Sequence, residues 1–333
     1  MSAPLLEIRN VSKRFVKKLD VAGRIAARLG ADISEETVHA VDNVSLTINK
    51  GEVVGLVGES GCGKSTLGRV VAGIHSPTAG QVFFEGQDIS ALDGARKREV
   101  TLAVQMIFQD PFASLNQRMR VEDIIGEAPV YHGLTTRAEK SDYVDEIMGK
   151  VGLDPSLKKR YPHQFSGGQR QRIGIARALA VKPRFLVCDE AIAALDVSIQ
   201  AQVINLFMDL REDFDLTYLF ISHDLSVVEH IADRVLIMYL GRVVESGKTE
   251  EIFDRPVHPY TSALLAEAPR LDQRKREFAP IKGEIPSPLD PPSGCHFHPR
   301  CPHVIGDCSK EQPAFDTVRQ SHFAACHLRD RFV

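Results

Sequence analysis

The sequence predicts an α/β protein whose core is a sheet of parallel strands. Short apolar runs of strand length alternate with helical segments through most of the chain. One of these runs, "VVGLV" (53–57), leads directly into a glycine-rich loop and then into a helical stretch. After about residue 270 the composition changes, and "GEIPSPLDPPSGC" (283–295) predicts an irregular strap or linker. These three observations define a main domain followed by a smaller extension.

The overall composition fits this division. The chain has 333 residues, of which 43% are hydrophobic and 26% are charged, as expected for a globular protein with a sizeable core. A net charge of −3 does not indicate a nucleic-acid partner. The N-terminus carries charges too early for a signal peptide, and no run approaches the roughly 18 apolar residues of a membrane span. We therefore expect a cytoplasmic chain that serves a membrane, if it does so, through partner chains.

In the first part of the chain, "LLEIRNVSKRF" (5–15) predicts an edge strand followed by a turn. Residues 16–39 predict a short helical insertion, in which Asp32 and Glu35 would cap a second helical turn. Strands are predicted over "VSLTI" (44–48) and "QVFFEGQDI" (81–89).

The middle of the chain predicts helices and further strands. Residues 121–152 have helical spacing, with four apolar residues on one face: Val144, Ile147, Met148 and Val151. Apolar strands are predicted in "RFLVCDE" (184–190), "LTYLFISH" (216–223), "RVLIMYL" (234–240) and "RVVESG" (242–247).

The glycine-rich loop "GESGCGKST" fits the pattern of a phosphate-binding loop in its proper context, between a strand and a helix. Its glycines let backbone N–H groups face phosphate oxygens, and the helix N-terminus adds partial positive charge. Lys64 can reach the β- and γ-phosphates, and the Ser65 hydroxyl can bind Mg²⁺. The predicted nucleotide-binding residues here are Gly58, Glu59, Ser60, Gly61, Cys62, Gly63, Lys64, Ser65 and Thr66. Cys62, like Cys188, is predicted to be a small, buried and inert side chain.

Two carboxylates follow another apolar strand. "RFLVCDE" ends in Asp189 and Glu190, at the strand end where parallel sheets bind nucleotides. Asp189 can hold Mg²⁺, and Glu190 can polarise the water that attacks the γ-phosphate. Phosphoryl transfer needs mainly positioning and charge neutralisation, which these groups can supply.

"FSGGQRQRIGIARALA" (165–180) predicts a second helix start that binds anions. Ser166 can cap the helix, and the two glycines leave N–H groups open. This run resembles the signature motif of ATP-binding cassette (ABC) ATPases, with Ser166, Gly167, Gly168 and Gln169 as its binding residues. In that family two subunits pair head to tail, and ATP lies between the phosphate loop of one subunit and the signature helix of the other.

The other landmarks of the ABC family follow in order. Gln109 in "MIFQDP" resembles the glutamine that senses Mg²⁺ and the membrane partner, and Asp196 in "AALD" resembles the D-loop aspartate. His223 in "ISHD" resembles the switch histidine that contacts the γ-phosphate, and Phe15 takes the place of the aromatic that stacks on adenine. The resemblance implies catalysis by Glu190, His223 and Lys64, with Mg²⁺ held by Ser65, Gln109 and Asp189.

The resemblance also implies the fold: a RecA-like core, an antiparallel β subdomain and a helical signature subdomain at about 115–180. The ABC domain would occupy residues 1–270 and the extension residues 271–333. Two departures are Phe165, where Leu is commonest, and "DEAIAALD", in which Ala193 removes a hydroxyl of the D-loop region. Glu190 and Asp196 are kept, so an active hydrolytic site is expected.

The tail narrows the family. "RPVHPYTSALLAEAP" and "GEIPSPLDPPSGCHFHPRCP" resemble the C-terminal extension of oligopeptide and dipeptide permease ATPases, in their F-type partner. This implies a peripheral subunit at the cytoplasmic face of the membrane. Its partners would be a second ATPase subunit, two transmembrane permeases and an extracytoplasmic binding protein. In this family the second ATPase is often a paralogue. Cargoes other than peptides (nickel, glutathione or sugars), a soluble non-transport ATPase and a non-hydrolysing scaffold subunit remain as alternatives.

Four of the six cysteines lie in the tail: Cys295, Cys301, Cys308 and Cys326. In a cytoplasmic chain such clustering points to metal before disulfides. Spacing alone leaves zinc, an iron–sulfur cluster and free thiols open, because the tight Cys pairs of structural zinc sites are missing. Resemblance to peptide-importer ATPases implies a [4Fe–4S] cluster on these four cysteines, with zinc as the alternative.

Overall fold

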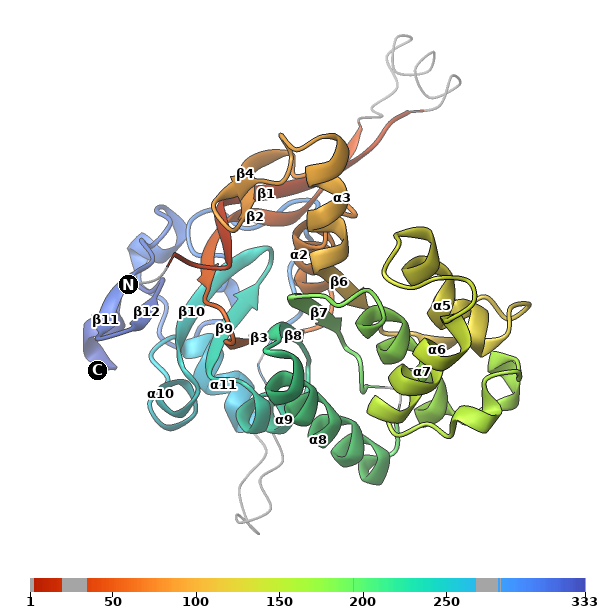
Figure 1. Ribbon diagram of the computed structural model, residues 1–333. Coiled ribbons are helices and arrows are strands. Elements are labelled where there is room, and N and C mark those ends of the chain that lie inside the picture. The colour runs from red at the N-terminus through yellow and green to blue at the C-terminus, as the bar shows by residue number, and fades with distance from the viewer. Residues whose placement is uncertain (1–2, 20–34, 194, 268–280, 282, 333) are drawn as a thin grey trace.

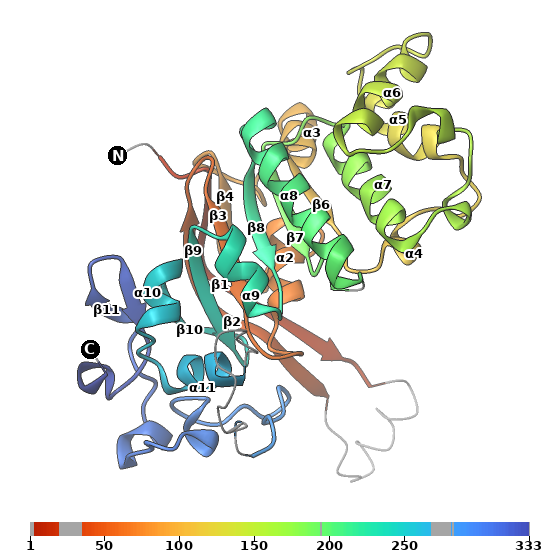
Figure 2. The same ribbon diagram turned by 90° about the horizontal axis from the view of Figure 1, so that it is seen from below.

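The computed structural model describes residues 3–19, 35–193, 195–267, 281 and 283–332. Its described part contains two sheets and a separate group of helices. Figures 1 and 2 show the helices α5–α7 standing apart from the sheets, on the side opposite to the C-terminal segment. The α/β fold predicted from the sequence is confirmed.

The larger sheet has eight strands in the order β11-β12-β10-β9-β3-β8-β7-β6. The five strands from β9 to β6 in this order are parallel, and β10, β12 and β11 extend the sheet by antiparallel pairing. β3, β7 and β8 are buried at every residue, which explains their unbroken apolar runs. The strands are β3 (Val53–Val57), β6 (Val104–Ile107), β7 (Phe185–Asp189), β8 (Thr217–Ile221), β9 (Arg234–Tyr239), β10 (Arg242–Lys248), β11 (Asp316–Arg319) and β12 (His322–Ala324).

The smaller sheet is antiparallel, in the order β2-β1-β4-β5. Its strands are β1 (Leu6–Lys17), β2 (Glu36–Ile48), β4 (Ala79–Phe84) and β5 (Gln87–Asp88). The prediction of an edge strand and turn at the N-terminus was wrong, because β1 pairs with β2 on one side and β4 on the other and continues to Lys17. One buried face, as at Leu6 and Ile8, is common to edge and central strands, so the local pattern does not reveal the neighbours.

The predicted helical insertion at 16–39 was wrong at its described ends. Val16 pairs with Thr37 and Lys17 pairs with Glu36, so the two ends of the segment form an antiparallel β-ladder between β1 and β2. Residues 20–34 lie outside the described residues, and so does Asp32 of the predicted Asp32–Glu35 cap. The two arms are β-branched or charged at these positions and suit an exposed ribbon better than a helix end.

The helices flank the core sheet or form the separate group. Val144, Ile147, Met148 and Val151 are all buried in that group, as the helical spacing predicted. The helices are α2 (Lys64–Val71), α3 (Gly94–Ala103), α4 (Pro111–Ser114), α5 (Val121–Tyr131), α6 (Lys140–Lys150), α7 (Gly167–Leu179), α8 (Val197–Phe214), α9 (Leu225–Ile231), α10 (Thr249–Asp254) and α11 (Pro259–Glu267). Short 3₁₀ turns are η1 (Pro155–Leu157), η2 (Pro162–Gln164), η3 (His298–Arg300), η4 (Gly306–Ser309) and η5 (Arg329–Arg331).

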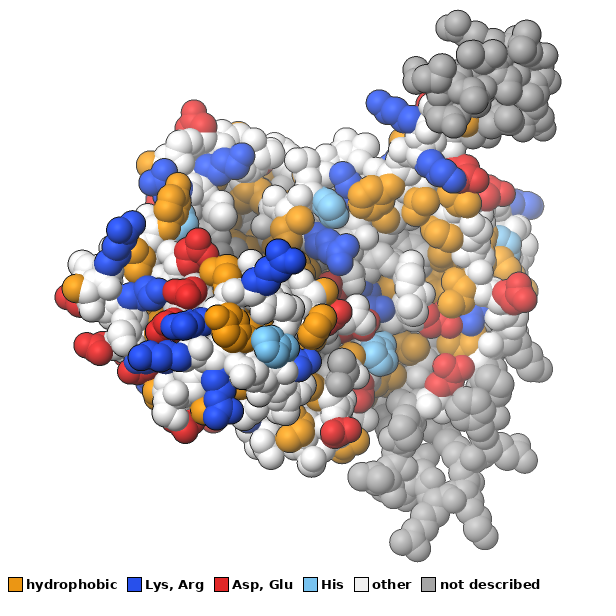
Figure 3. Space-filling model, turned by 90° about the vertical axis from the view of Figure 1, so that its right-hand side faces the viewer, with side chains coloured by type: hydrophobic (Ala, Val, Ile, Leu, Met, Phe, Trp, Pro, Cys, Tyr) orange, Lys and Arg blue, Asp and Glu red, His pale blue; other side chains and the backbone are white. Residues whose placement is uncertain are grey.

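The surface on the side of α5–α7 mixes basic, acidic and apolar side chains, as Figure 3 shows. A hollow of about 760 Å³ on α5, α6 and the loops beside them combines both signs of charge. Arg120 and Lys140 line it together with Asp123 and Glu127, and Tyr131 at its side is 79% exposed. Interspersed charges of this kind do not create a strong field of one sign.

The end of the chain is part of the large sheet. β12 pairs with β10, so that Glu245 faces Ala324 and Ser246 faces Phe323. The fully buried Glu245 carboxylate accepts hydrogen bonds from the backbone N–H groups of Val257 and His258, and His322 Nε2 lies 2.7 Å from it. The extension is therefore anchored by backbone pairing and a buried carboxylate. The boundary at 270/271 stays a prediction.

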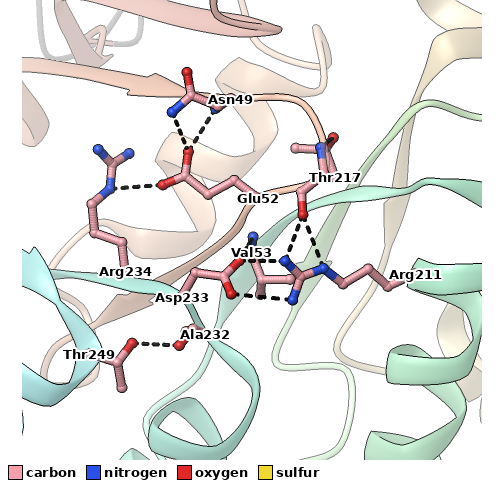
Figure 4. A network of polar contacts seen from close by, with 10 residues as sticks. Asn49, Glu52, Val53, Arg211, Thr217, Ala232, Asp233, Arg234 and Thr249 are labelled. Atoms are coloured by element: carbon pink, nitrogen blue, oxygen red, sulfur yellow. Dashed lines mark hydrogen bonds and ion pairs between the residues drawn. The ribbon is translucent and has the colours of Figure 1, made fainter.

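A network of polar contacts lies at the N-terminal ends of β3 and β9 in the large sheet (Figure 4). The guanidinium of Arg211 in α8 donates from Nε (3.0 Å) and Nη2 (2.7 Å) to the carbonyl of Gly51. The same Nη2 donates to Asp233 Oδ2 (2.7 Å), which also accepts from the Val53 N–H. Arg211 thus ties helix α8 to the starts of two central strands.

We expect Arg211→Ala to lower the free energy of unfolding by about 1–3 kcal/mol, because the Gly51 carbonyl and Asp233 lose a charged donor. Urea unfolding followed by circular dichroism measures the change. Arg96→Ala is the control, since Arg96 pairs with Glu99 on the exposed surface and such pairs contribute about 0–1 kcal/mol. Equal losses in both variants would contradict the role given to Arg211.

Candidate nucleotide site and cysteine cluster

The phosphate loop leaves the C-terminal end of β3 and enters α2. Gly63 has a φ of 106°, and a Cβ added there would lie 2.0 Å from the Ala40 carbonyl oxygen. Only glycine fits both the backbone angle and this close approach. The loop is therefore held against β2, in the position from which phosphate loops bind an anion through their backbone N–H groups.

Lys64 is 4% exposed and its ammonium lies on the loop itself. Nζ donates to the carbonyl oxygens of Gly58 (2.7 Å) and Glu59 (3.0 Å). A buried ammonium needs such partners, and anionic phosphate oxygens would replace them with stronger charge-assisted bonds. The Lys64 ammonium therefore lies against the loop that the sequence predicts to bind phosphate.

Asp189 at the end of β7 contacts Ser65 at the start of α2. The Ser65 hydroxyl donates to Asp189 Oδ1 at 2.7 Å, which brings the end of β7 to the start of α2. Burial raises the pKa of the Asp189 carboxyl, while the Ser65 hydrogen bond and the positive charge of Arg69 oppose that rise. A carboxylate beside a hydroxyl is an oxygen-donor set that suits Mg²⁺.

Glu190 is the centre of the predicted catalytic group. Its Oε2 accepts from Gln109 Nε2 at 2.6 Å, and its Oε1 lies 3.5 Å from His223 Nδ1. The backbone of Glu190 has a φ of 47°, the left-handed region that non-glycine residues rarely adopt. In this backbone conformation the Glu190 carboxylate contacts both Gln109 and His223.

A hollow of about 330 Å³ connects these groups. Lys64, Ser65, Gln109 and Glu190 line it, whereas Asp189 and His223 are not among its lining residues. Phe15 of β1 and Pro288 of the extension also line it, as do Ser60, Gly61, Gly63 and Thr66. Phe15 is 38% exposed and packs edge-on against His75. The sequence-predicted aromatic therefore borders the hollow, and the Lys13 ammonium lies 5.1 Å from the centroid of its ring.

The signature residues lie elsewhere. The Ser166 side chain caps α7 by accepting from the Gln169 N–H (3.3 Å), and Gln169 Oε1 accepts from the Ser166 N–H (3.0 Å). Ser166, Gly167 and Asp196 are exposed, and none of them lines the hollow among the described residues. Phe165, which replaces the commoner leucine, packs in the core at 4% exposure.

Two contacts of the phosphate loop were not predicted from the sequence. Arg300 of the extension forms two hydrogen bonds to the Glu59 carboxylate, and the Glu59 N–H donates to the Tyr260 hydroxyl. Together with Pro288 they bring α11 and the extension to the nucleotide side of the sheet. Neither residue belongs to a nucleotide motif, so no local signal points to it.

The four cysteines of the tail gather around one small cavity. Cys295, Cys301, Cys308 and Cys326 all line it, beside His298, His303 and His327, and none forms a disulfide. Burial raises the pKa of Cys295 and of Cys326 to about 11 and also raises the pKa of Cys301. Within the described part of the chain, no three His, Cys, Asp or Glu side chains form a group that could hold a single metal ion.

Two family models match parts of the chain. Residues 41–193 match the ABC transporter family, and residues 244–308 match the family described as the oligopeptide/dipeptide transporter C-terminal region. No helix in the described ranges is both long and apolar enough to cross a membrane.

Relatives match along the whole chain. The oligopeptide transport ATP-binding protein AppF of Bacillus subtilis is 52% identical over 97% of both chains. A putative peptide import ATP-binding protein of Brucella ovis is 48% identical over 98% of both.

Solved structures share the fold of the core. An ATP-binding cassette in a dimeric post-hydrolysis state with ADP and Pi has a TM-score of 0.62 at 26% identity, covering 73% of this chain and 98% of that one. CbiO1 from Clostridium perfringens, part of an ABC transporter complex, has a TM-score of 0.61 at 26% identity, covering 77% and 93%. The chain is an ATP-hydrolysing subunit of the ABC transporter family and belongs to the oligopeptide/dipeptide branch of that family.

Proposed function

We propose that this chain powers an importer of peptides by binding and hydrolysing ATP. The observation that carries the proposal is the 52% identity to an oligopeptide transport ATP-binding protein over nearly the full length of both chains. Lys64, Ser65 and Glu190 line one hollow, and Asp189 accepts a hydrogen bond from Ser65, which supports the chemistry. Charge on a transferred phosphoryl group needs such preorganised partners.

The importer would contain several chains. The exposure of Ser166 and Asp196 outside the hollow supports a head-to-tail dimer, in which the signature residues of one ATPase complete the site of the other. Val197 beside Asp196 is 81% exposed, as expected of an apolar residue that a partner covers. We propose a paralogous ATPase partner, two transmembrane permeases, an extracytoplasmic binding protein and a position at the cytoplasmic face of the inner membrane.

The residues would act as follows. Lys64 exchanges its loop carbonyls for phosphate oxygens, the loop N–H groups bind the phosphates, and Phe15 stacks on adenine. Ser65 and Asp189, with Gln109, would hold the Mg²⁺ that accompanies ATP. Closure against the partner's signature residues moves the permeases. Glu190 then leaves Gln109 to polarise the attacking water, and His223 with Lys64 steadies the γ-phosphate.

Glu190→Gln should bind ATP with unchanged affinity and lose at least about 100-fold in turnover, because the amide cannot accept the proton of the attacking water. Phosphate release by the assembled complex measures the loss. Glu229→Gln, an exposed change on α9, serves as the control. Turnover at the wild-type rate in Glu190→Gln would rule out Glu190 as the base.

Lys64→Ala should weaken ATP binding about tenfold or more, because the buried site loses its only direct lysine contact to the phosphates among the residues that line the hollow. Isothermal titration with a non-hydrolysable ATP analogue measures the affinity. Unchanged affinity would refute the assignment of the phosphate loop.

We also propose that Cys295, Cys301, Cys308 and Cys326 hold a [4Fe–4S] cluster. Convergence of four unpaired cysteines on one cavity supports the donor set. A single zinc ion needs all its sulfurs about 2.3 Å from one point, whereas a cluster takes one thiolate on each of four irons and leaves the cysteines farther apart. The resemblance of the tail to that of peptide-importer ATPases is the reason for proposing the cluster in preference to zinc. When bound, the cluster would supply a covalent cross-link of the tail.

Protein purified without oxygen should contain about four irons and four acid-labile sulfides per chain. Cys301→Ser should lose them, because one iron loses its thiolate, whereas Cys62→Ser in the phosphate loop should keep them. Metal analysis and sulfide determination give both numbers. One zinc per chain without sulfide would replace the cluster with a structural zinc site, and metal-free protein would contradict both.

Uptake of labelled peptide into vesicles that hold the whole complex tests the function itself. ATP-dependent accumulation that stops in Glu190→Gln supports a peptide importer. Accumulation of nickel, glutathione or sugar in place of peptide would keep the transporter and change its cargo. ATP hydrolysis without association with a permease would instead identify a soluble ATPase.

A further inference from the structure

The phosphate loop is held by a buried ion pair from outside the nucleotide domain. Arg300 Nη1 donates to Glu59 Oε2 at 2.7 Å, and Nη2 donates to Glu59 Oε1 at 3.0 Å. The Arg300 side chain is 4% exposed and that of Glu59 is 18% exposed. Two parallel hydrogen bonds between a guanidinium and a carboxylate fix both the distance and the orientation of the partners.

Aromatic residues enclose this pair. The Tyr260 hydroxyl accepts from the Glu59 N–H at 2.9 Å, and the Tyr239 hydroxyl accepts from Arg300 Nη1 at 3.4 Å. The rings of Tyr239, Tyr260 and Phe297 pack together with centroids 4.7–5.3 Å apart. Because all three rings are buried, Glu59 is held at its backbone and at its carboxylate within a rigid, low-dielectric surrounding.

Glu59 is also a direct neighbour of the reacting groups. Its carbonyl oxygen accepts from Lys64 Nζ at 3.0 Å, so any shift of Glu59 changes the position of the lysine that faces the phosphates. Its carboxylate is an unfavourable charge beside an anionic ligand. Arg300 neutralises that charge and holds it outside the hollow, whose lining includes Ser60 and Gly61 but not Glu59.

A second contact comes from the same extension. Pro288 lines the hollow, and its carbonyl accepts from the His39 N–H of β2 at 3.0 Å. The extension therefore reaches the nucleotide hollow directly at one place and the phosphate loop at another. A segment that only capped the large sheet would need neither contact.

We propose that Arg300 is a positioning residue of the nucleotide site: through Glu59 it holds the phosphate loop and Lys64 in the geometry that binds ATP, so that the C-terminal extension sets the affinity for the nucleotide. This inference rests on the proposed assignment of the loop as the ATP site. It requires no metal in the cysteine cavity.

The test compares Arg300→Ala, Arg300→Lys and the control Arg329→Ala in the assembled complex. Arg329 pairs with Asp316 at 2.9 Å inside the extension and so reports on a general loss of packing there. We expect Arg300→Ala to raise KM for ATP about tenfold or more while kcat changes less than threefold, because the closed complex still contains every reacting group. Arg300→Lys keeps the positive charge but cannot form the two parallel hydrogen bonds of a guanidinium. Its KM for ATP should therefore lie between those of the wild type and Arg300→Ala.

A double-mutant cycle of Arg300→Ala with Glu59→Gln measures the coupling between these two side chains in ATP binding. Removal of the carboxylate charge in Arg300→Ala/Glu59→Gln should recover part of the lost affinity, since the uncompensated charge beside the phosphates is gone. This double variant also keeps the test valid if Arg300→Ala folds poorly. Additive losses, a KM within twofold of wild type in Arg300→Ala, or an equal change in Arg329→Ala would each overturn the proposal.

Failure of this inference can be told apart from failure of the proposed function. If Lys64→Ala abolishes ATP binding but Arg300→Ala does not weaken it, the loop is the ATP site and Arg300 is only structural. If Lys64→Ala also binds ATP normally, the site assignment itself is wrong.

Discussion

The parallel pairing of β3 with β8 and β9 is the constraint on which the nucleotide site depends. Val53 to Val57, the whole strand, pair with one neighbour or the other, and every residue of β3 is buried. Because parallel strands end at the same edge and β8 also pairs with β7, the loop after β3 lies near the carboxylates at the end of β7 and the histidine after β8. The local sequence determines the phosphate loop, the carboxylates and the histidine separately, and the pairing of the strands brings them close together.

The same arrangement shows where strain is placed. Glu190 follows β7 in a left-handed backbone conformation, and its N–H still bonds to the Ile221 carbonyl of β8. The rigid sheet can hold such a conformation because its backbone groups are satisfied on both sides. The glutamate is turned toward Gln109 and His223 without losing its place in the ladder.

Much of this site could be predicted from the sequence, because its motifs are short and local. The phosphate loop needs glycines at defined positions, and Gly63 meets that need both by its φ and by its contact with Ala40. Prediction failed where the answer depends on distant partners. The place of β1 in the middle of its sheet depends on β4, some 70 residues later, and the ribbon at Val16 and Thr37 depends on pairing across an insertion. Arg300 was missed for the same reason, since 241 positions separate it from Glu59.

The buried link between Glu59 and the extension has a thermodynamic consequence. Binding free energies are reciprocal, so a segment that strengthens nucleotide binding must itself be held more firmly when nucleotide is bound. Each catalytic cycle would then alternately tighten and relax the short 3₁₀ turn between Cys295 and Cys301, on which Arg300 lies. The rate of amide hydrogen exchange in that turn would then depend on whether nucleotide is bound, although the turn is far along the chain from the phosphate loop.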